Sequence, residues 1–406
     1  MTDTDTLREI LADGEWLLNR EEPLVERDLA THMLERAKYS VIEVATGVRR
    51  AGKSKLLMWV GRHLIEGGRR VYYINFEDDR FVPDARDFQK LSSLMDLSKA
   101  VLLVDEPQNM PRWELWVRRM HDRGVKVYVT GSNSRLLGKE MATALGGRKK
   151  QHEVFPFSFS EYLRALGKED LPSDQKVKEL ERYMEEGGFP YPTVSGDYSV
   201  LVDYRRDILE RDILLRHDIR DDVDMRNIVR FLMSNPGLYL SHKSIKGFAD
   251  ISHPTLRKYL EYIAQAYAVI PLEKYGYSQR EQIKSPKKFY PVDNGLLMKK
   301  DDRGRLLESV VVQHIRRLTD RIYYWKDDRG REVDIFLPEK NLAIQVVYDL
   351  TPENLKREKK GLEVAAEKIG ARPLIVYLHG GGDTKYPALK ATTFIEKIET
   401  TLSTFA

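Results

Sequence analysis

The sequence GVRRAGKS, residues Gly47 to Ser54, decides the fold of this chain. An apolar run, residues 41–45, precedes it, and a run with helical spacing, residues 55–65, follows it. A strand, a glycine-bounded loop and a helix form the context in which a GxxxxGKS sequence binds phosphate. Gly47 and Gly52 allow backbone angles and a close approach that a side chain would block. The stretch therefore predicts a phosphate-binding loop of the Walker A type.

The residue types of this loop suit a nucleotide triphosphate with magnesium. Successive loop N–H groups and the N-terminus of the following helix can form a cradle for anions. Lys53 would reach the β- and γ-phosphates, and the Ser54 hydroxyl would ligate Mg²⁺. The alternative is a glycine turn in an unrelated α/β unit. The residues predicted to contact the nucleotide are Gly47, Val48, Arg49, Arg50, Ala51, Gly52, Lys53, Ser54 and Lys55.

Composition narrows the class of protein. A chain of 406 residues predicts two to four domains, since a domain spans roughly 100–200 residues. Lys and Arg number 67 against 63 Asp and Glu, a balance too even to indicate nucleic-acid binding by itself. The absence of cysteine excludes disulfides, zinc–cysteine sites and thiol catalysis. No signal-peptide pattern and no apolar run of membrane-spanning length occur, so we expect a cytoplasmic protein.

Strands and helices alternate after the loop. This order, with strands that are apolar along their length, predicts a parallel sheet covered on both faces. Ligands of such sheets bind at the carboxyl ends of the strands, where the glycine loop and Asp105-Glu106 both fall. The predicted strands are 71–76, 101–104 and 125–130, and the predicted helices are 85–95 and 111–123.

The sequence VLLVDE, ending in Asp105 and Glu106, is the second motif. A carboxylate at the tip of a buried strand can hold Mg²⁺ through water, which suits Asp105. Glu106 would then polarise the attacking water as general base. The alternative is a pair of solvated carboxylates at a strand end.

Polar residues end two further strands. Asn133 or Ser132 is predicted to sense the γ-phosphate, with a plain helix cap as the alternative. Asn75 is a candidate to hold Glu106 in an inactive rotamer.

Four segments in this order, GVRRAGKSKLL, VLLVDEPQNM, VTGSNSRLL and GGRKKQHEVFPFSFSEYL, resemble the prokaryotic AAA+ ATPases of the AAA_14 type. These proteins usually carry a C-terminal domain of the DUF4143 type, and the resemblance covers nearly the whole chain. It implies a five-stranded AAA+ core and hydrolysis of ATP with Mg²⁺ coupled to movement. It also implies a homo-oligomer, with a hexamer among the candidate ring sizes.

A ring of this kind needs a cation supplied across the subunit interface to stabilise the γ-phosphate charge. Arg148, in the sequence GGRKK before the strand-like residues 153–157, is the first candidate for this arginine finger, and Arg135 is the second. The alternative for Arg148 is a solvated basic turn.

The predicted fold class is α/β, with four parts. An AAA+ P-loop core with a parallel sheet spans residues 1–165, and a helical lid spans 166–222. A winged helix follows at 223–298, and a restriction-endonuclease-like α/β domain occupies 299–406.

The winged-helix prediction follows from a helix, a short helix, a turn, a helix and a hairpin in succession. Ser252 would cap the recognition helix. Residues at the start of such helices meet base edges and phosphates, which favours DNA contact; the alternative is use for packing or protein contacts. The residues in question are His253, Thr255, Arg257 and Lys258, with Lys284, Lys287 and Lys288 as a basic edge of the wing.

The tail has the αβββαβ order that resembles restriction-endonuclease-like domains. Their metal site uses a helix Glu, a strand-start Asp and an acidic-X-Lys sequence. Glu308 and Asp334 fit the first two positions, whereas Gln345 and Val347 replace the acid and the lysine. Without them the metal loses an anionic ligand and the water loses its charge partner, so the site is predicted to be degenerate.

An alternative source of the missing lysine is Lys356 or Lys359. The degenerate tail would serve to dock DNA or protein.

Together these features predict an ATPase that remodels or moves on DNA through its winged-helix and nuclease-like modules. One alternative is a nucleotide-dependent signalling or scaffold switch that acts on protein partners. Another is an ATP-regulated DNA nuclease.

Overall fold

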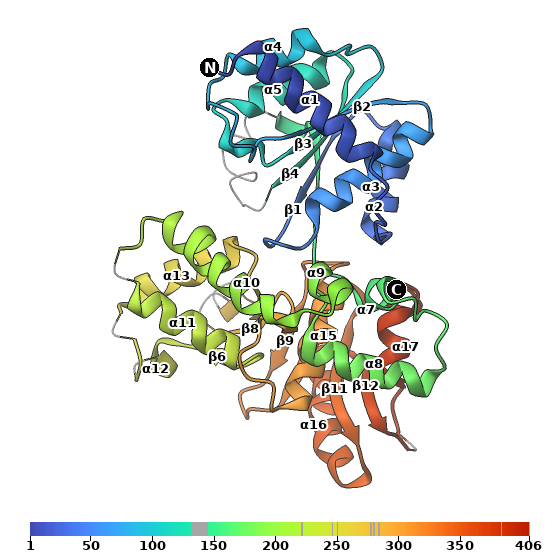
Figure 1. The fold of residues 1–406 in the computed structure, drawn as a ribbon. Coiled ribbons are helices and arrows are strands. Elements are labelled where there is room, and N and C mark those ends of the chain that lie inside the picture. The colour runs from blue at the N-terminus through green and yellow to red at the C-terminus, as the bar shows by residue number, and fades with distance from the viewer. Residues whose placement is uncertain are drawn as a thin grey trace. The chain divides into compact units, whose positions relative to one another are not determined.

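The computed structural model describes residues 1–131, 145–220, 222–245, 247–249, 251–276, 278, 281–282, 285–382 and 384–405. Contacts between Cα atoms divide the chain into two compact units, Met1–Phe155 and Pro156–Ala406, which are described separately (Figure 1). The four-part division at residues 165, 222 and 298 remains a prediction.

The first unit contains a five-stranded, wholly parallel sheet in the order β2-β3-β4-β1-β5. This confirms the parallel five-stranded core that the sequence predicted. Its elements are α1 (Thr4–Asn19), α2 (Asp28–Glu35), β1 (Ile42–Thr46), α3 (Lys53–Glu66), β2 (Arg70–Asn75), α4 (Asp87–Leu94), β3 (Ala100–Asp105), α5 (Trp113–Asp122), β4 (Lys126–Gly131) and β5 (Lys149–Glu153).

The central strands β1, β3 and β4 are buried along their whole length, as expected for strands covered on both faces. Helix α1 packs against the edge strand β2, so closely that a Cβ on Gly14 would lie 2.1 Å from the Tyr73 carbonyl oxygen. Asn75, Asp105 and Thr130 lie in register at the carboxyl ends of β2, β3 and β4. The sheet therefore gathers its polar strand ends at one edge.

The fifth strand lies earlier than the sequence predicted. We expected a strand at residues 153–157, but β5 spans Lys149–Glu153 and is the outer strand beside β1. An edge strand has one unpaired side and tolerates charged residues, which hides it from an apolar pattern. The apolar residues 154–157 instead carry the chain across the boundary between the two units.

The second unit is built on an eight-stranded mixed sheet in the order β13-β12-β11-β10-β9-β7-β8-β6. Its strands are β6 (Tyr239–Leu240), β7 (Val269–Lys274), β8 (Lys287–Pro291), β9 (Tyr323–Lys326), β10 (Glu332–Leu337), β11 (Leu342–Leu350), β12 (Arg372–Gly380) and β13 (Ala388–Lys390). Its helices are α7 (Phe159–Ala165), α8 (Ser173–Glu186), α9 (Pro190–Ser195), α10 (Leu201–Asp207), α11 (Val223–Ser234), α12 (His242–Ile245), α13 (His253–Gln265), α15 (Arg303–Arg316), α16 (Pro352–Ile369), α17 (Ala391–Glu396) and α18 (Ile398–Thr404).

The region predicted as a winged helix contains α11, α12 and α13, followed by the antiparallel pair β7 and β8. The hairpin does not end the sheet, because β7 pairs antiparallel with β8 and parallel with β9 of the tail. The predicted wing and the predicted tail therefore share one sheet. In the region predicted as the helical lid, α10 is followed by a π-helical stretch, Ile208–Leu215.

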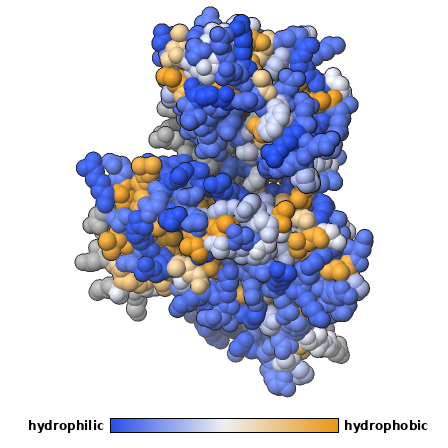
Figure 2. Space-filling model, in the orientation of Figure 1, coloured by the Kyte–Doolittle hydropathy of each residue, from blue (hydrophilic) through white to orange (hydrophobic). Residues whose placement is uncertain are grey.

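The face of the molecule drawn in Figure 2 is mainly hydrophilic, with hydrophobic residues scattered among charged ones. Trp16, Tyr191 and Leu215 are among the large hydrophobic side chains that are exposed. Among the described residues, no helix combines the length and apolar character needed to cross a membrane.

Candidate functional site

The loop Gly47–Gly52 joins the buried strand β1 to helix α3, and its shape depends on its two glycines. Gly47 has φ 152° and Gly52 has φ 89°, both in the region that side chains avoid. A Cβ on Gly47 would lie 2.1 Å from the Val154 carbonyl oxygen. Helix α3 begins at Lys53, directly after Gly52. The loop N–H groups thus meet the positive end of a helix, the arrangement that binds anions.

Lys53 lies folded over the loop that precedes it. Its Nζ donates to the carbonyl oxygens of Gly47 at 3.1 Å and Val48 at 3.0 Å, and its side chain is buried. These carbonyls are neutral acceptors, so a phosphate oxygen would offer the ammonium a stronger partner at the same place. Lys53 therefore suits the phosphate-binding role predicted from the sequence.

Asp105 ends β3 and is almost fully buried. Tyr73 donates its hydroxyl proton to Asp105 Oδ2 at 2.8 Å, and the Thr130 hydroxyl contacts Oδ1. Burial raises the pKa of Asp105 and the Glu106 charge adds to this rise, while hydrogen bonds from Ser54, Thr130 and Tyr73 lower it. Ser54, the predicted metal ligand, thus lies beside the predicted Walker B carboxylate. Sequence reasoning missed Tyr73 and Thr130, which hold that carboxylate.

Glu106 has φ 49°, a strained left-handed conformation for this residue type, and its side chain is largely buried. The Gln108 amide contacts Glu106 Oε2. The Oδ1 of Asn75, the residue predicted to restrain Glu106, accepts a hydrogen bond from the Glu77 backbone N–H at 2.9 Å, and restraint of Glu106 by Asn75 remains a prediction. Gln108 is therefore one residue that holds Glu106, and only its position two residues later in the chain could have suggested it.

Arg27, just before α2, joins the loop to the end of the first unit. Its guanidinium donates to the Ala51 carbonyl oxygen at 3.1 Å and to the Phe155 carbonyl oxygen at 2.7 Å, and it is 5% exposed. Val154, the residue before Phe155, donates its N–H to the carbonyl oxygen of Thr46, the last residue of β1 before the loop, at 2.6 Å. The phosphate loop and residues 154–155 are thus tied together in two places. No sequence pattern indicated this role of Arg27.

The remaining arginines and lysines predicted to act at the nucleotide site have the following surroundings. Arg49 pairs with Glu77 at 4.0 Å, and Lys55 pairs with Glu22 at 2.7 Å. Arg148 precedes β5, is exposed, and pairs with Asp122 at 3.5 Å. Arg50 is exposed, with φ 69°.

Three predicted residues fall outside the part of the chain that the structure describes. They are Asn133, Ser132 and Arg135.

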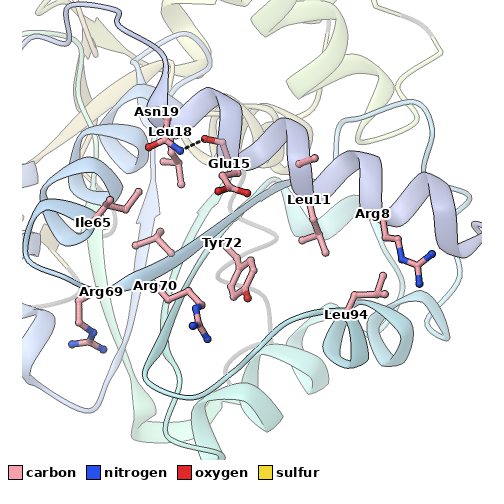
Figure 3. A pocket seen from close by; sticks show the side chains of 12 residues that line it. Arg8, Leu11, Glu15, Leu18, Asn19, Ile65, Arg69, Arg70, Tyr72 and Leu94 are labelled. Atoms are coloured by element: carbon pink, nitrogen blue, oxygen red, sulfur yellow. Dashed lines mark hydrogen bonds between the residues drawn. The ribbon is translucent and has the colours of Figure 1, made fainter.

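A cavity of about 620 Å³ lies between α1, the end of α3 and the start of β2 (Figure 3). Tyr72 projects into it between Leu11 and Leu94, and Arg69 and Arg70 line one side. Arg70 is the first residue of β2, so the cavity opens at the amino end of the strand. It is therefore distinct from the phosphate loop, which lies at the carboxyl ends.

In the second unit, the Ser252 hydroxyl caps α13 by accepting the Thr255 N–H at 3.3 Å, as predicted. His253, Arg257 and Lys258 are exposed on the first turns of the helix. Lys258 also lies over the Tyr262 ring, with its Nζ 5.6 Å from the ring centre.

The basic edge predicted for the wing is partly wrong. Lys287 pairs with Glu273 at 2.6 Å, Lys288 is buried, and Lys284 lies outside the described residues. Because Lys288 is on the inner face of β8, it cannot meet DNA. Alternation along a short strand does not reveal which lysine faces inward until the partner strands are known.

The predicted metal residues of the tail do not converge. Glu308 on α15 and Asp334 on β10 do interact, and burial together with the Glu308 charge raises the pKa of Asp334 well above its ordinary value. Gln345 lies between Ala343 and Val347 on β11, and both of these residues pack in the core beneath α16. Gln345 is therefore on the face of the sheet that α16 covers, not on the face that meets Glu308. Its amide donates to Glu358 of α16 at 3.1 Å.

Among the described residues, no group of three or more acidic, histidine or cysteine side chains is arranged to hold a metal ion. Glu332 joins Glu308 and Asp334 beside Lys288. Sequence reasoning missed Glu332 as a member of this cluster.

The strand order, the glycine loop between β1 and α3, and the acidic tip of β3 define a P-loop nucleotide-binding protein of the AAA+ class. The family model for an AAA domain, AAA_14, matches residues 40–163, and models for two domains of unknown function, DUF8612 and DUF4143, match 177–304 and 303–395. The chain belongs to this AAA_14 family, with a C-terminal DUF4143 domain.

Curated relatives match over most of their length. Uncharacterized protein MJ1544 of Methanocaldococcus jannaschii is 31% identical, with 85% of this chain and 82% of the relative covered. An uncharacterized protein of Haemophilus influenzae is 30% identical, with 77% and 84% covered. Uncharacterized protein Rv2008c of Mycobacterium tuberculosis is 26% identical, with 90% and 82% covered.

Solved structures with partial similarity include the replication initiator DnaA bound to AMPPCP and single-stranded DNA. It shares 14% identity at a TM-score of 0.33, with 53% of this chain and 72% of that chain covered. Cdc6p from Pyrobaculum aerophilum shares 11% identity at a TM-score of 0.27, with 67% and 93% covered.

Proposed function

We propose that this protein binds and hydrolyses ATP with Mg²⁺ and uses the cycle to remodel or move on DNA. The observation that carries the proposal is the loop at Gly47–Ser54. Its glycines have the required backbone angles, its lysine rests on neutral carbonyls, and the Asp105 carboxyl lies beside Ser54. These residues fit a nucleotide phosphate chain with its metal.

Each residue has a distinct role in this proposal. Lys53 would bind the β- and γ-phosphates, and Ser54 and Asp105 would hold Mg²⁺, which neutralises charge developing on the phosphates. Tyr73 and Thr130 keep the Asp105 carboxyl oriented. Glu106 would accept the proton of the attacking water, after release from Gln108.

The exposed start of α13 supports DNA as the partner. His253, Arg257 and Lys258 extend from the capped end of a helix, a place where phosphate and base contacts are made. We expect duplex DNA to stimulate ATP turnover and bind more weakly as salt rises, because phosphate contacts release counterions. The test is ATPase turnover without DNA and with duplex, single-stranded and branched DNA. If none of these DNA molecules changed the rate of ATP turnover, the proposal that DNA is the partner would be contradicted.

The alternative, a nucleotide-dependent switch acting on protein partners, is favoured by one observation. Two of the three lysines predicted for the basic edge of the wing do not offer a free charge, since Lys288 is buried and Lys287 is paired with Glu273. A switch would show slow turnover that is insensitive to DNA. Arg257→Glu combined with Lys258→Glu would then leave turnover and partner binding unchanged.

Assembly into a homo-oligomer, including a hexameric ring, is part of the proposal. Arg148 is exposed at the amino end of β5, where it can meet a neighbouring copy and serve as the arginine finger. Light scattering with and without ATP would measure the particle size. A mixture of Arg148→Ala and Glu106→Gln subunits tests whether the arginine acts across the interface.

A further inference from the structure

The carboxylate cluster of the second unit holds a lysine where the fold that the tail resembles would hold a metal. Lys288 on β8 is 3% exposed. Its Nζ lies 3.3 Å from Glu308 Oε1 and 2.5 Å from Glu332 Oε1. These carboxylates come from α15 and β10, the elements that carry the predicted metal residues Glu308 and Asp334.

The surroundings of the ammonium form a built site. Tyr290 donates its hydroxyl proton to Glu308 at 2.5 Å, and Tyr239 donates to Glu332 at 2.5 Å. The rings of Tyr239 and Tyr324 have their centres 5.7 Å and 5.8 Å from Lys288 Nζ, within range for a cation–π contact. Such a set of partners stabilises a buried ammonium.

A divalent ion needs carboxylate oxygens that are open to it. Here Oε1 of Glu308 and both oxygens of Glu332 already accept hydrogen bonds or ion pairs, and Lys326 adds a second ammonium 3.2 Å from Glu332. Gln345, the third position of the expected metal site, faces α16 instead. The residues present therefore do not fit a divalent metal.

We propose that the Lys288 ammonium is the resident cation of this carboxylate cluster, so that the nuclease-like tail takes no divalent metal and does not cut DNA. The same lysine ties β8 of the predicted wing to α15 and β10 of the tail. The proposal is independent of the nucleotide site, since every residue in it belongs to the second unit.

The first experiment measures Mn²⁺ binding to the full chain by electron paramagnetic resonance, without nucleotide. The wild type and Asp334→Asn are expected to bind the same amount of Mn²⁺, because Asp334 is not a metal ligand. A Mn²⁺ site that is lost in Asp334→Asn would overturn the proposal, and so would Mn²⁺-dependent nicking of DNA that this substitution abolishes.

The second experiment measures thermal unfolding. Lys288→Met should lower Tm by about 10 °C, because the half-buried carboxylates of Glu308 and Glu332 lose the buried Lys288 ammonium and Glu332 keeps only Lys326. Adding Glu332→Gln to that variant should recover part of the loss, whereas Lys288→Arg should keep most of the stability. If Lys288→Met is insoluble, the double variant with Glu332→Gln supplies the measurement.

Lys287→Met is the matched control, since Lys287 is the neighbouring lysine in a half-exposed pair with Glu273. It is expected to change Tm by no more than about 2 °C. A Lys288→Met protein as stable as this control would overturn the proposal.

Discussion

Each of the two units buries a lysine side chain, but the two lysines have partners of opposite kinds. Lys53 contacts the carbonyl oxygens of Gly47 and Val48, which are neutral and can be exchanged for phosphate oxygens. Lys288 contacts the carboxylates of Glu308 and Glu332, and an incoming anion would have to replace these charged partners to reach the ammonium. An exchangeable partner makes a binding site, whereas a buried ion pair makes a permanent connection.

The largest expected effect concerns Glu106, the residue proposed to activate the attacking water in the first unit. Glu106→Gln keeps the size of the side chain but removes the proposed general base, so turnover should fall by about 10²- to 10⁴-fold while ATP still binds. Single-turnover hydrolysis and a fluorescent-nucleotide titration measure the two effects. Normal turnover would show that another residue activates the water.

The second prediction tests whether the partners of Lys53 are exchangeable. Lys53→Ala should weaken ATP binding about 100-fold, because a charged hydrogen bond to phosphate is lost. Lys90→Ala is the matched control, since Lys90 is a lysine of the same unit whose ammonium also donates to a backbone carbonyl, that of Thr2 at 2.6 Å, but lies outside the predicted nucleotide contacts. Unchanged ATP affinity in Lys53→Ala would contradict the proposal that Lys53 exchanges its carbonyl partners for phosphate oxygens. Equal losses in both variants would mean that net charge alone matters.

The third prediction concerns α15 of the second unit, the helix that carries Glu308, a partner of Lys288. Burial, with Arg317 nearby, lowers the pKa of His314 from 6.5 to about 3. Its Nε2 accepts the Phe159 N–H at 3.0 Å, and its Nδ1 donates to the Val310 carbonyl at 2.8 Å, so the folded protein needs the neutral ring.

The pKa of His314 is lower in the folded protein than in the unfolded chain. The stability that depends on the neutral ring is therefore fully present above pH 6.5 and is lost as the pH falls. Between pH 7 and pH 5 the loss should be about 2 kcal/mol relative to His314→Gln. Urea unfolding of both proteins at each pH measures it. Asp293, whose pKa burial raises to about 6, has the opposite sign but is present in both proteins. Parallel pH profiles would contradict a neutral, buried His314.

The smallest expected effect concerns Arg27, which connects the loop Gly47–Gly52 to Phe155. Arg27→Met should weaken ATP binding about 5-fold, since the loop loses one hydrogen bond at Ala51. Arg62→Met is the control, because Arg62 also donates to backbone carbonyls, those of Leu18 and Glu22, away from the loop. A larger loss in Arg62→Met than in Arg27→Met would show that general stability sets the affinity.

The sequence alone predicted the first unit well because its signals are local. A glycine-bounded loop of eight residues and a strand ending in two acids each lie within one short segment, and the sheet topology brings their ends together. The edge strand β5 escaped prediction because charged residues are tolerated where one side of a strand is unpaired.

Contacts between distant segments were decided only by the tertiary structure. Arg27 meets Ala51 and Phe155, and Lys288 meets Glu308 and Glu332, through packing of elements far apart in the chain. Whether Lys288 faces solvent or a carboxylate depends on the pairing of β7 with β8 and β9, which no periodicity encodes. The sequence by itself therefore determined the phosphate loop, and the fold decided which lysine became a permanent internal cation.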